Sequence, residues 1–260
     1  MTKTSGASQN RVPLSCCIIV KNEADRIARC IEAVQGISDD IVVVDSGSTD
    51  ATVEIARQLG ARTFFRAWDG YGPQKRHAEE LAAHDWILNI DADEVVTPEL
   101  ANEIADLLGA GPPPVKAYRF RQVTVYPHQD RPRLWADAHN YVRLYDRRAV
   151  RFRDSLVHDT VDLAGQEAGQ LQGSALHFSW RSLEHVTRKL DSYTDLQAKE
   201  LRKNPAAVML RLPFEYPVLF FRYYVLRRHF TGGLYGVKTA HTIAAGRTKR
   251  LTKFLKHHAT

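Results

Sequence analysis

The sequence contains few cysteines, and their arrangement suggests neither a cross-link nor a metal knuckle. Of three cysteines in 260 residues, Cys16 and Cys17 are adjacent in an apolar run, and Cys30 lies in the amphipathic stretch that follows. Disulfide-dependent secreted domains instead have regularly spaced cysteines in even numbers. The sequence therefore predicts reduced, buried thiols in a cytoplasmic protein.

Other features are also missing. The first twelve residues are polar, and the apolar run Leu14–Val20 lacks the basic flank and cleavage site of an export signal. There is no internal repeat or low-complexity tract, and no pair of histidines has the spacing of a zinc site with a third ligand nearby. We expect one catalytic domain with an appendage, because 260 residues do not suffice for two large domains.

Two familiar nucleotide-binding loops are absent. Asp45-Ser-Gly-Ser-Thr-Asp50 follows an apolar run and opens a helical pattern. It is too short for the phosphate loop of ATP-hydrolysing proteins and lacks the three glycines of a dinucleotide fingerprint. The segment therefore supports neither ATP hydrolysis nor nicotinamide chemistry.

Negative charge is scarce at the back of the chain. Residues 176–260 contain 16 Lys and Arg against 5 Asp and Glu, whereas residues 1–175 contain 20 against 25. A mildly acidic front is thus joined to a strongly basic back. This asymmetry predicts an anionic partner for the back, either nucleic acid or a membrane surface.

Apolar runs alternate with amphipathic stretches through residue 108. Strand patterns cover residues 14–20, 41–44, 62–65 and 86–90, and helical patterns cover residues 27–34, 50–59, 73–83 and 98–108. Thr97 and Pro98 are suited to the start of the last helix. Strands this apolar must be covered on both faces, so the sequence predicts an α/β fold with a mostly parallel sheet between helices.

The pattern is looser after Gly109. Strand-like pieces at 117–126 and 141–145 are separated by aromatic, histidine-rich and arginine-rich loops, and a long helical pattern runs from Ser182 to Asn204. We interpret the arginines of the middle segment as a solvated face. In the alternative interpretation, one or two of them bind a phosphate of the donor or acceptor. They are Arg143, Arg147, Arg148, Arg151 and Arg153.

Polar clusters end three of the predicted strands. They are Lys21-Asn22-Glu23, Asp45 to Asp50, and Asn89-Ile-Asp91-Ala-Asp93-Glu94. The carboxyl ends of parallel strands meet at one edge of a sheet, where ligands bind, so one nucleotide site explains all three clusters. Asp91 and Asp93 supply hard oxygen ligands, which suit Mg²⁺ or Mn²⁺ shared with a diphosphate.

These motifs resemble a known family. Val20-Lys-Asn-Glu-Ala24, Val44-Asp-Ser-Gly-Ser-Thr-Asp50, Tyr71-Gly-Pro-Gln-Lys75 and Trp86 to Glu94 are similar to family 2 inverting glycosyltransferases of the GT-A fold. The nearest likeness is to lipopolysaccharide inner-core β-glucosyltransferases of the WaaE and LgtF type. It is dense over residues 14–108. A looser likeness includes Val157-His-Asp159, His177-Phe-Ser, the helix with Lys189 and Tyr193, and Gly232-Gly-Leu-Tyr-Gly236.

The sequence departs from these relatives at two places. His158-Asp159 stands where they have His-Glu, which shortens the candidate base by one methylene, and Gly232-Gly233 replaces an Asp-Gly turn. The second departure leaves the acceptor open.

The resemblance implies a role for each matching residue. Glu23 and Asp45 would contact the uridine of a nucleotide-sugar donor, beside Asn22 and Ser46. Asp91 would contact the ribose and the metal, Asp93 would be the main ligand of Mg²⁺ or Mn²⁺, and Lys75 would lie near the nucleotide. The implied donor is a UDP-hexose, most simply UDP-glucose, and the implied acceptor is a lipopolysaccharide core or similar glycolipid.

Inverting sugar transfer also needs a carboxylate that takes the proton of the acceptor hydroxyl. Asp91 and Asp93 are assigned to the metal, so the base must come from the later segment. We choose Asp159, beside His158 and near the apolar Val161, and Asp154 and Asp137 remain rivals.

We expect residues 1–175 to form the GT-A catalytic domain. Its nucleotide-sugar half would cover about residues 14–108, and its acceptor half about residues 115–175. Residues 176–260 would form a helical, amphipathic and basic segment.

The apolar stretch 206–226 is long enough to span a bilayer, but Arg211, Glu215 and Arg222 interrupt it. Pro213 and Pro217 would also break a helix, so we expect no span. The charges and rings of 220–228 instead predict peripheral, salt-sensitive attachment to an anionic inner-membrane surface. They are Arg222, Arg227 and Arg228 with Phe220, Phe221, Tyr223 and Tyr224.

Two alternatives remain open for this segment. A helical subdomain with a solvated basic face would have the same composition. A nucleic-acid-binding module would also be basic, but the segment has no zinc-finger, homeodomain or RNP-like pattern, so we expect no nucleic-acid partner. A non-catalytic nucleotide-binding protein with a basic tail is the alternative for the whole chain.

Overall fold

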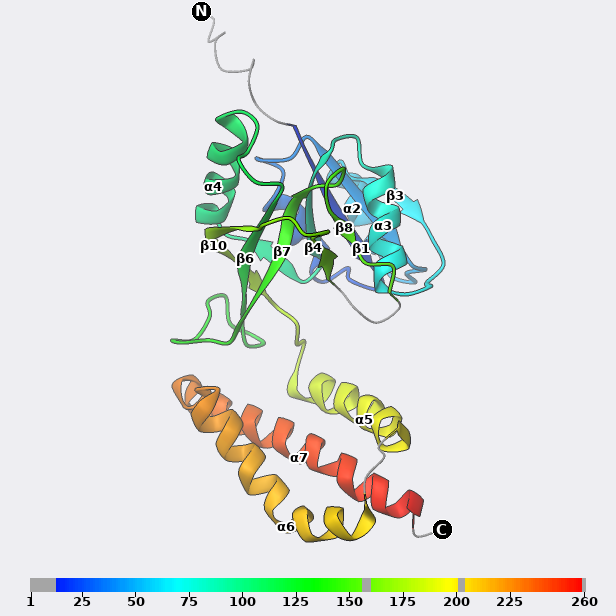
Figure 1. Cartoon of the computed structure of the whole chain (residues 1–260), viewed down its shortest axis with the longest axis vertical. Coiled ribbons are helices and arrows are strands. Elements are labelled where there is room, and N and C mark those ends of the chain that lie inside the picture. The colour runs from blue at the N-terminus through cyan, green and yellow to red at the C-terminus, as the bar shows by residue number, and fades with distance from the viewer. Residues whose placement is uncertain (1–12, 156–159, 201–203, 259–260) are drawn as a thin grey trace, which may run out of the picture. The chain divides into compact units, whose positions relative to one another are not determined.

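The computed structural model describes residues 13–155, 160–200 and 204–258 and divides the chain into two units (Figure 1). Unit 1 comprises residues 1–123 and 138–177, and unit 2 comprises residues 124–137 and 178–260. The segment 124–137 therefore groups with the C-terminal helices. The domain boundary after residue 175 stays a prediction.

Unit 1 is built on an eight-stranded sheet of order β3-β2-β1-β4-β7-β6-β10-β5. The strands are β1 (Leu14–Val20), β2 (Asp40–Asp45), β3 (Arg62–Phe65), β4 (Trp86–Asp91), β5 (Glu94–Val96), β6 (Ala117–Thr124), β7 (Ala138–Asp146) and β10 (Gly169–His177). The first four strands pair in parallel, and β7 joins β4 antiparallel. A small second sheet pairs β8 (Arg151–Phe152) with β9 (Val161–Asp162).

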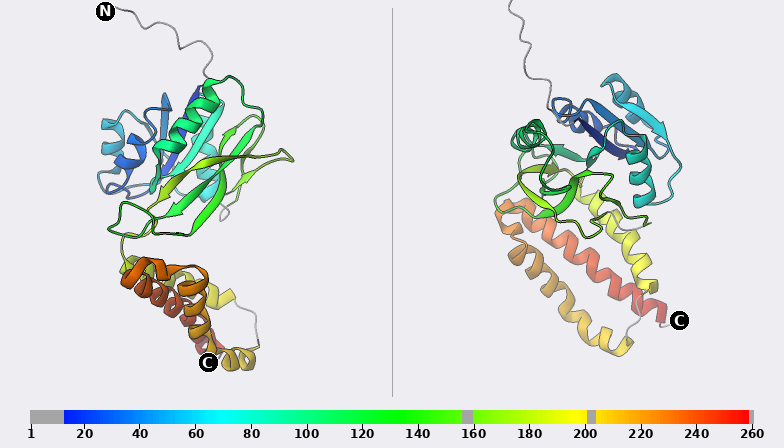
Figure 2. Two further views of the ribbon diagram at one scale, coloured as in Figure 1. Left: turned by 90° about the vertical axis from the view of Figure 1, so that its left-hand side faces the viewer. Right: turned by 45° about the horizontal axis from the view of Figure 1, so that its top comes forward.

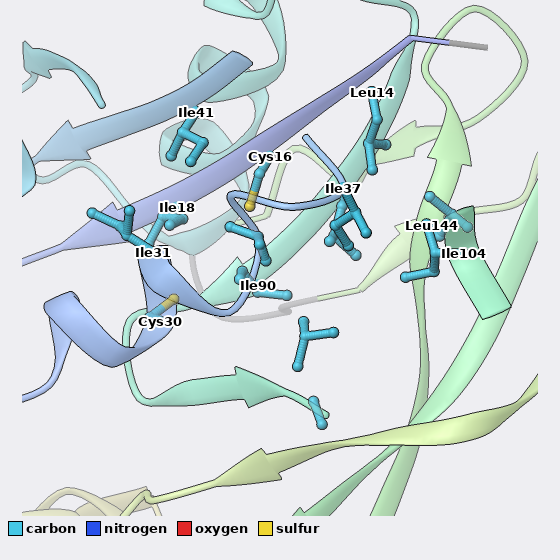
Figure 3. Close-up of a cluster of buried hydrophobic side chains, with 14 of the residues drawn as sticks. Leu14, Cys16, Ile18, Cys30, Ile31, Ile37, Ile41, Ile90, Ile104 and Leu144 are labelled. Atoms are coloured by element: carbon cyan, nitrogen blue, oxygen red, sulfur yellow. The ribbon is translucent and has the colours of Figure 1, made fainter. Parts of the chain in front are cut away.

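Helices cover both faces of the parallel strands. Side chains of α1 (Ile27–Glu32), α2 (Thr52–Gln58) and α4 (Pro98–Gly109) join the larger core cluster, while α3 (Tyr71–Leu81) packs on the other face. Figure 3 shows the larger cluster, in which Cys16 and Ile18 of β1 lie near Cys30 and Ile31 of α1. The predicted α/β architecture with a mostly parallel sheet between helices is confirmed.

Most elements predicted through residue 108 are confirmed, including the helix start at Pro98. The Thr97 hydroxyl accepts a hydrogen bond from the backbone N–H of Leu100. Strands β5, β8, β9 and β10 were not predicted, because three of them are two or three residues long and β10 carries no strict polar alternation.

The cysteines are free thiols in the core, as predicted. Cys16, Cys17 and Cys30 are fully buried. Burial raises the pKa of each thiol, so all three stay protonated at neutral pH.

Unit 2 is helical. It contains α5 (Leu183–Glu200), α6 (Pro205–Phe221), the short helices η1 (Arg222–Leu226) and η2 (His229–Gly232), and α7 (Gly233–His258). Helix α7 packs along both α5 and α6 (Figure 2). Val208 of α6 meets Leu251 and Phe254 of α7 in a small core cluster.

The expectation that Pro213 and Pro217 would break a helix is wrong. Helix α6 runs through both prolines. Each proline removes one helical hydrogen bond, at a cost of about 3 kcal/mol, but packing against α7 maintains the helix. Within the described residues, no helix combines the length and apolar character needed to cross a membrane.

A buried carboxylate joins three parts of unit 1 near the amino end of the parallel strands. Asp40 accepts hydrogen bonds from the Ser15 hydroxyl at 2.5 Å, the Ala83 backbone N–H at 2.7 Å and the Arg62 guanidinium at 2.7 Å. Burial alone would raise the pKa of Asp40, but these donors lower it below its usual range. Asp40 therefore ties β1 and β3 to the segment that precedes β4.

We predict that Asp40→Ala destabilises the fold by about 3 kcal/mol, because it leaves the buried Ser15 hydroxyl and the partly buried Ala83 N–H without their acceptor. Urea unfolding measures the change. The difference from wild type should be full above the ordinary carboxyl pKa and shrink as pH falls through the lowered folded value. Asp39→Ala, at a neighbouring side chain that is 63% exposed, is the control. Equal loss in both variants would contradict the assignment.

Candidate active site

The parallel pairing brings the three polar clusters together. Strand β1 lies between β2 and β4, with Val20 opposite Asp45 and Ile19 opposite Asp91. The loops that follow these three strands therefore leave the sheet side by side. This edge holds Asn22, Glu23, Asp45, Ser46, Asp91 and Asp93.

The Asp45 carboxylate shapes the loop after β2. It accepts hydrogen bonds from the backbone N–H groups of Gly47 at 3.0 Å and Ser48 at 3.1 Å, and from the Ser48 hydroxyl at 2.5 Å. Gly47 has a φ of 97°, which favours glycine. The carboxylate thus fixes the turn. A uridine bound here would share the Asp45 carboxylate with Gly47 and Ser48.

The loop after β1 is fastened to the loop after β2. Asn22 adopts a left-handed φ of 57°, which asparagine tolerates, and its side-chain oxygen accepts a hydrogen bond from the Thr49 N–H at 2.8 Å. The Glu23 N–H donates to the Thr52 hydroxyl at 2.8 Å. These bonds tie the two loops to each other.

Asp91 lies against two buried cations. The Lys75 ammonium is 2.8 Å from one carboxylate oxygen, and the Arg143 guanidinium is 3.3 Å from the other. Both cations also lie over the ring of Phe152. Burial alone would raise the pKa of Asp91, but the charges of Lys75 and Arg143 lower it. Asp91 is therefore an anion at neutral pH.

Asp93 has a different pair of partners. Arg26 lies 3.5 Å from its carboxylate, and the His177 ring nitrogen Nε2 lies 3.6 Å away. Burial alone would lower the pKa of His177, but the neighbouring Asp93 carboxylate raises it. Arg26 also pairs with Glu23, so a chain of charges links the ends of β1 and β4.

A third carboxyl lies behind this pair. Glu94 is buried, and its carboxylate accepts a hydrogen bond from the Asp91 N–H at 3.1 Å. Burial, reinforced by the negative charge of Asp91, raises its pKa to about 7. Glu94 therefore supports the turn between β4 and β5 and is less suited to hold a cation.

The start of α3 is packed tightly against the segment after β8. A Cβ at Gly72 would lie 2.1 Å from the Arg153 carbonyl oxygen, and the Gly72 N–H donates to the Ser155 carbonyl at 2.9 Å. Gln74, two residues on, donates to the Ser46 hydroxyl at 3.1 Å. Helix α3 thus connects the loop after β2 with the segment that leads to the candidate base.

The structure describes two of the three candidate bases, Asp154 and Asp137. Asp159 and its neighbour His158 lie outside the described residues. Asp154 is exposed just before them in unit 1. Asp137 belongs to unit 2, where Arg133 at 2.9 Å, Arg227 and His229 surround its carboxylate.

The structure adds residues that sequence reasoning did not place at the site. Arg143 was expected on a solvated face, which is wrong, because it is buried against Asp91. Arg26 had no signal in the sequence. His177 is part of the His177-Phe-Ser motif, to which sequence reasoning assigned no role. It lies on the unpredicted strand β10, opposite Glu94 of β5 in the antiparallel ladder.

The described residues contain no group of three or more His, Cys, Asp or Glu side chains placed to hold a metal ion. Asp91 and Asp93 are the two carboxylates that the sequence led us to expect as oxygen ligands of a cation, and both lie at this edge. Mg²⁺ commonly binds through one or two carboxylates and completes its shell with substrate phosphates and water. The residues present therefore fit a cation that arrives with a diphosphate.

Comparison with known proteins gives relatives that match over most of both chains. The chain is 37% identical over 251 residues to an uncharacterized glycosyltransferase of Rickettsia conorii, covering 92% of this chain and 89% of that protein. It is 29% identical over 256 residues to the lipopolysaccharide core biosynthesis glycosyltransferase LpsC of Rhizobium meliloti, covering 96% and 94%.

Solved structures give weaker likenesses. Glucosyl-3-phosphoglycerate synthase of Mycobacterium tuberculosis, in complex with Mn²⁺, UDP and glucosyl-3-phosphoglycerate, is 22% identical, with 45% of each chain covered and a TM-score of 0.36. TarS of S. aureus in complex with UDP-GlcNAc is 20% identical, with 46% and 37% covered and a TM-score of 0.39.

The family model described as glycosyl transferase family 2 matches residues 15–166. The matched segment contains the parallel strands and the three loops that carry the polar clusters. The sequence resemblance is thereby confirmed at the level of the family, and the chain is an enzyme of glycosyl transferase family 2.

Proposed function

We propose that the chain transfers a hexose, glucose from UDP-glucose, to a lipopolysaccharide core or similar glycolipid at the inner face of a bacterial membrane. The observation that carries this proposal is the shared edge of β1, β2 and β4, where Asp91 and Asp93 lie among buried cations. The Rhizobium relative, a lipopolysaccharide core biosynthesis glycosyltransferase, supports the acceptor class.

The donor would lie across the ends of these strands. Asn22, Glu23, Asp45 and Ser46 would meet the uridine, and Asp91 the ribose. Lys75 would contribute positive charge near the nucleotide, although its bond to Asp91 means that it acts chiefly through that carboxylate.

Asp91 and Asp93 would hold Mg²⁺ or Mn²⁺. When bound, the cation would stabilise the negative charge of the departing diphosphate. The low pKa values of both carboxyls keep them ionised for this role. Arg26 and His177 balance the charge of Asp93 before a cation arrives.

The reaction is an in-line displacement at the anomeric carbon. Asp159 would take the proton of the acceptor hydroxyl as its oxygen forms the new glycosidic bond, and the bond from carbon to the diphosphate breaks. The contact between Gly72 and the 153–155 segment would hold the approach to Asp159 near α3. Asp154 and Asp137 are the alternatives.

The direct experiment is a screen of nucleotide sugars with a lipopolysaccharide acceptor, followed by analysis of the product. We expect UDP-glucose to be the preferred donor and the linkage to be inverted. Transfer of another hexose would correct the donor alone. Absence of any sugar transfer, together with a nucleic-acid gel shift, would overturn the proposal.

Asp93→Ala should abolish turnover and leave the fold intact, because this carboxylate lies at a strand end and outside the core. Initial rates with saturating Mn²⁺ or Mg²⁺ provide the measurement, and circular dichroism reports the fold. Asp39→Ala, near the amino end of the same sheet, is the matched control. A rate within about tenfold of wild type would remove Asp93 from the metal site.

Asp159→Asn should reduce the rate by roughly 10²–10⁴ with little change in UDP binding, which is the usual contribution of a positioned base. Parallel Asp154→Asn and Asp137→Asn variants test the rivals. If one of these is severely impaired while Asp159→Asn is mild, the role moves to that residue.

Gly72→Ala should slow turnover by up to about 100-fold, because its methyl group would collide with the Arg153 carbonyl and displace the segment before Asp159. UDP affinity and melting temperature should be measured beside the rate. Gly109→Ala is the control, since a Cβ there meets nothing within 4 Å. Unchanged turnover at Gly72→Ala would separate this contact from catalysis.

A further inference from the structure

One face of α6 is apolar and exposed. Leu210, Phe214, Val218 and Phe221 have exposed fractions of 77, 64, 59 and 55%, and Val225 of η1 is also exposed. Their spacings of three and four residues place them on one side of the helix. We call these five residues the α6 stripe. Monomeric proteins rarely leave so continuous an apolar row in water, so the stripe indicates a partner.

The opposite side of α6 is already used. Val208, Glu215 and Leu219 are buried, and Val208 packs with Leu251 and Phe254 of α7. The helix therefore cannot bury the stripe by rotating, because rotation would expose this packed side. The orientation of the stripe is fixed by the fold of unit 2.

The apolar surface continues beyond α6. Leu226 and Phe230 are exposed, and so are Leu134 and Trp135 of the segment 124–137. The Thr231 hydroxyl donates to the Leu134 carbonyl at 2.7 Å, and the Arg228 guanidinium lies 5.8 Å from the centre of the Trp135 ring. Leu134 and Trp135 are thus attached to residues 228–231, which follow α6 and η1.

The charges around the stripe indicate which kind of partner it binds. Residues 201–260 contain twelve Lys and Arg but one acidic residue, Glu215, which is buried and 2.6 Å from Arg211. Arg222, Arg227 and Arg228 are exposed beside the apolar residues. A second copy of this chain would oppose cations with cations, whereas an anionic leaflet supplies both apolar depth and negative charge.

We infer that the α6 stripe, with Leu134 and Trp135, inserts into the interfacial layer of an anionic lipid leaflet while the arginines bind lipid phosphates. This inference rests on the proposed function, which requires a glycolipid acceptor at a membrane surface. It also proposes fewer aromatic anchors than the sequence prediction. Phe220, Tyr223 and Tyr224 are partly buried, and Phe220 stacks on Tyr224 at 5.4 Å, so Phe221 is the one predicted ring that is exposed on the stripe.

The test uses the full chain and co-sedimentation with vesicles of phosphatidylglycerol and phosphatidylethanolamine, compared with phosphatidylcholine vesicles. Wild type should bind the anionic vesicles, and Phe214→Ser with Phe221→Ser should weaken binding by roughly tenfold per side chain. Met209→Ser is the matched control, because Met209 is an exposed apolar residue of α6 that lies off the stripe. Arg222→Gln should reduce the salt-sensitive part of binding.

The outcomes separate this inference from the proposed function. Equal binding by wild type and the double variant would overturn the inference, as would a wild-type dimer that the double variant converts to monomer without any effect on vesicles. Sugar transfer to a detergent-solubilised acceptor is measured on the same proteins. Transfer that persists without vesicle binding overturns only the membrane inference, and vesicle binding without any transfer overturns only the enzyme's proposed reaction.

Discussion

Asp91 is held between Lys75 and Arg143, two cations that are almost completely buried. Burying a cation without a partner is costly, so the three charges stabilise one another only together. Lys75 comes from α3 and Arg143 from β7, and the ring of Phe152 lies beneath both. This arrangement joins the parallel half of the sheet to the strands that follow it.

The same arrangement keeps two carboxylates ionised at this edge of the sheet. Asp91 and Asp93 remain ionised because separate cations face each of them, and Glu94 behind them has a pKa raised to about 7. This short stretch thus contains two carboxylates that stay ionised and suit a metal, and a third that is partly protonated at neutral pH. Environment, rather than residue type, separates their roles.

Unit 2 is built from packed helices rather than around a sheet. One side of α6 packs against α7, while the residues of the α6 stripe are exposed and lie beside the exposed Arg222, Arg227 and Arg228. The two prolines within α6 are tolerated because the packed side holds the helix. An enzyme that acts on a lipid-linked acceptor would benefit from such a surface.

The sequence by itself determined the parallel strands and the polar clusters at their ends. Those features depend on local periodicity, caps and the known geometry of parallel sheets, so Asp91, Asp93 and Asp45 could be expected at one edge. Tertiary structure alone decided the neighbours of Asp91 and Asp93. Arg143 and His177 lie on strands whose pairing joins distant parts of the chain. The exposed side of α6 was likewise undecided, because a helix with apolar residues around it shows its buried side only once a packing partner is known.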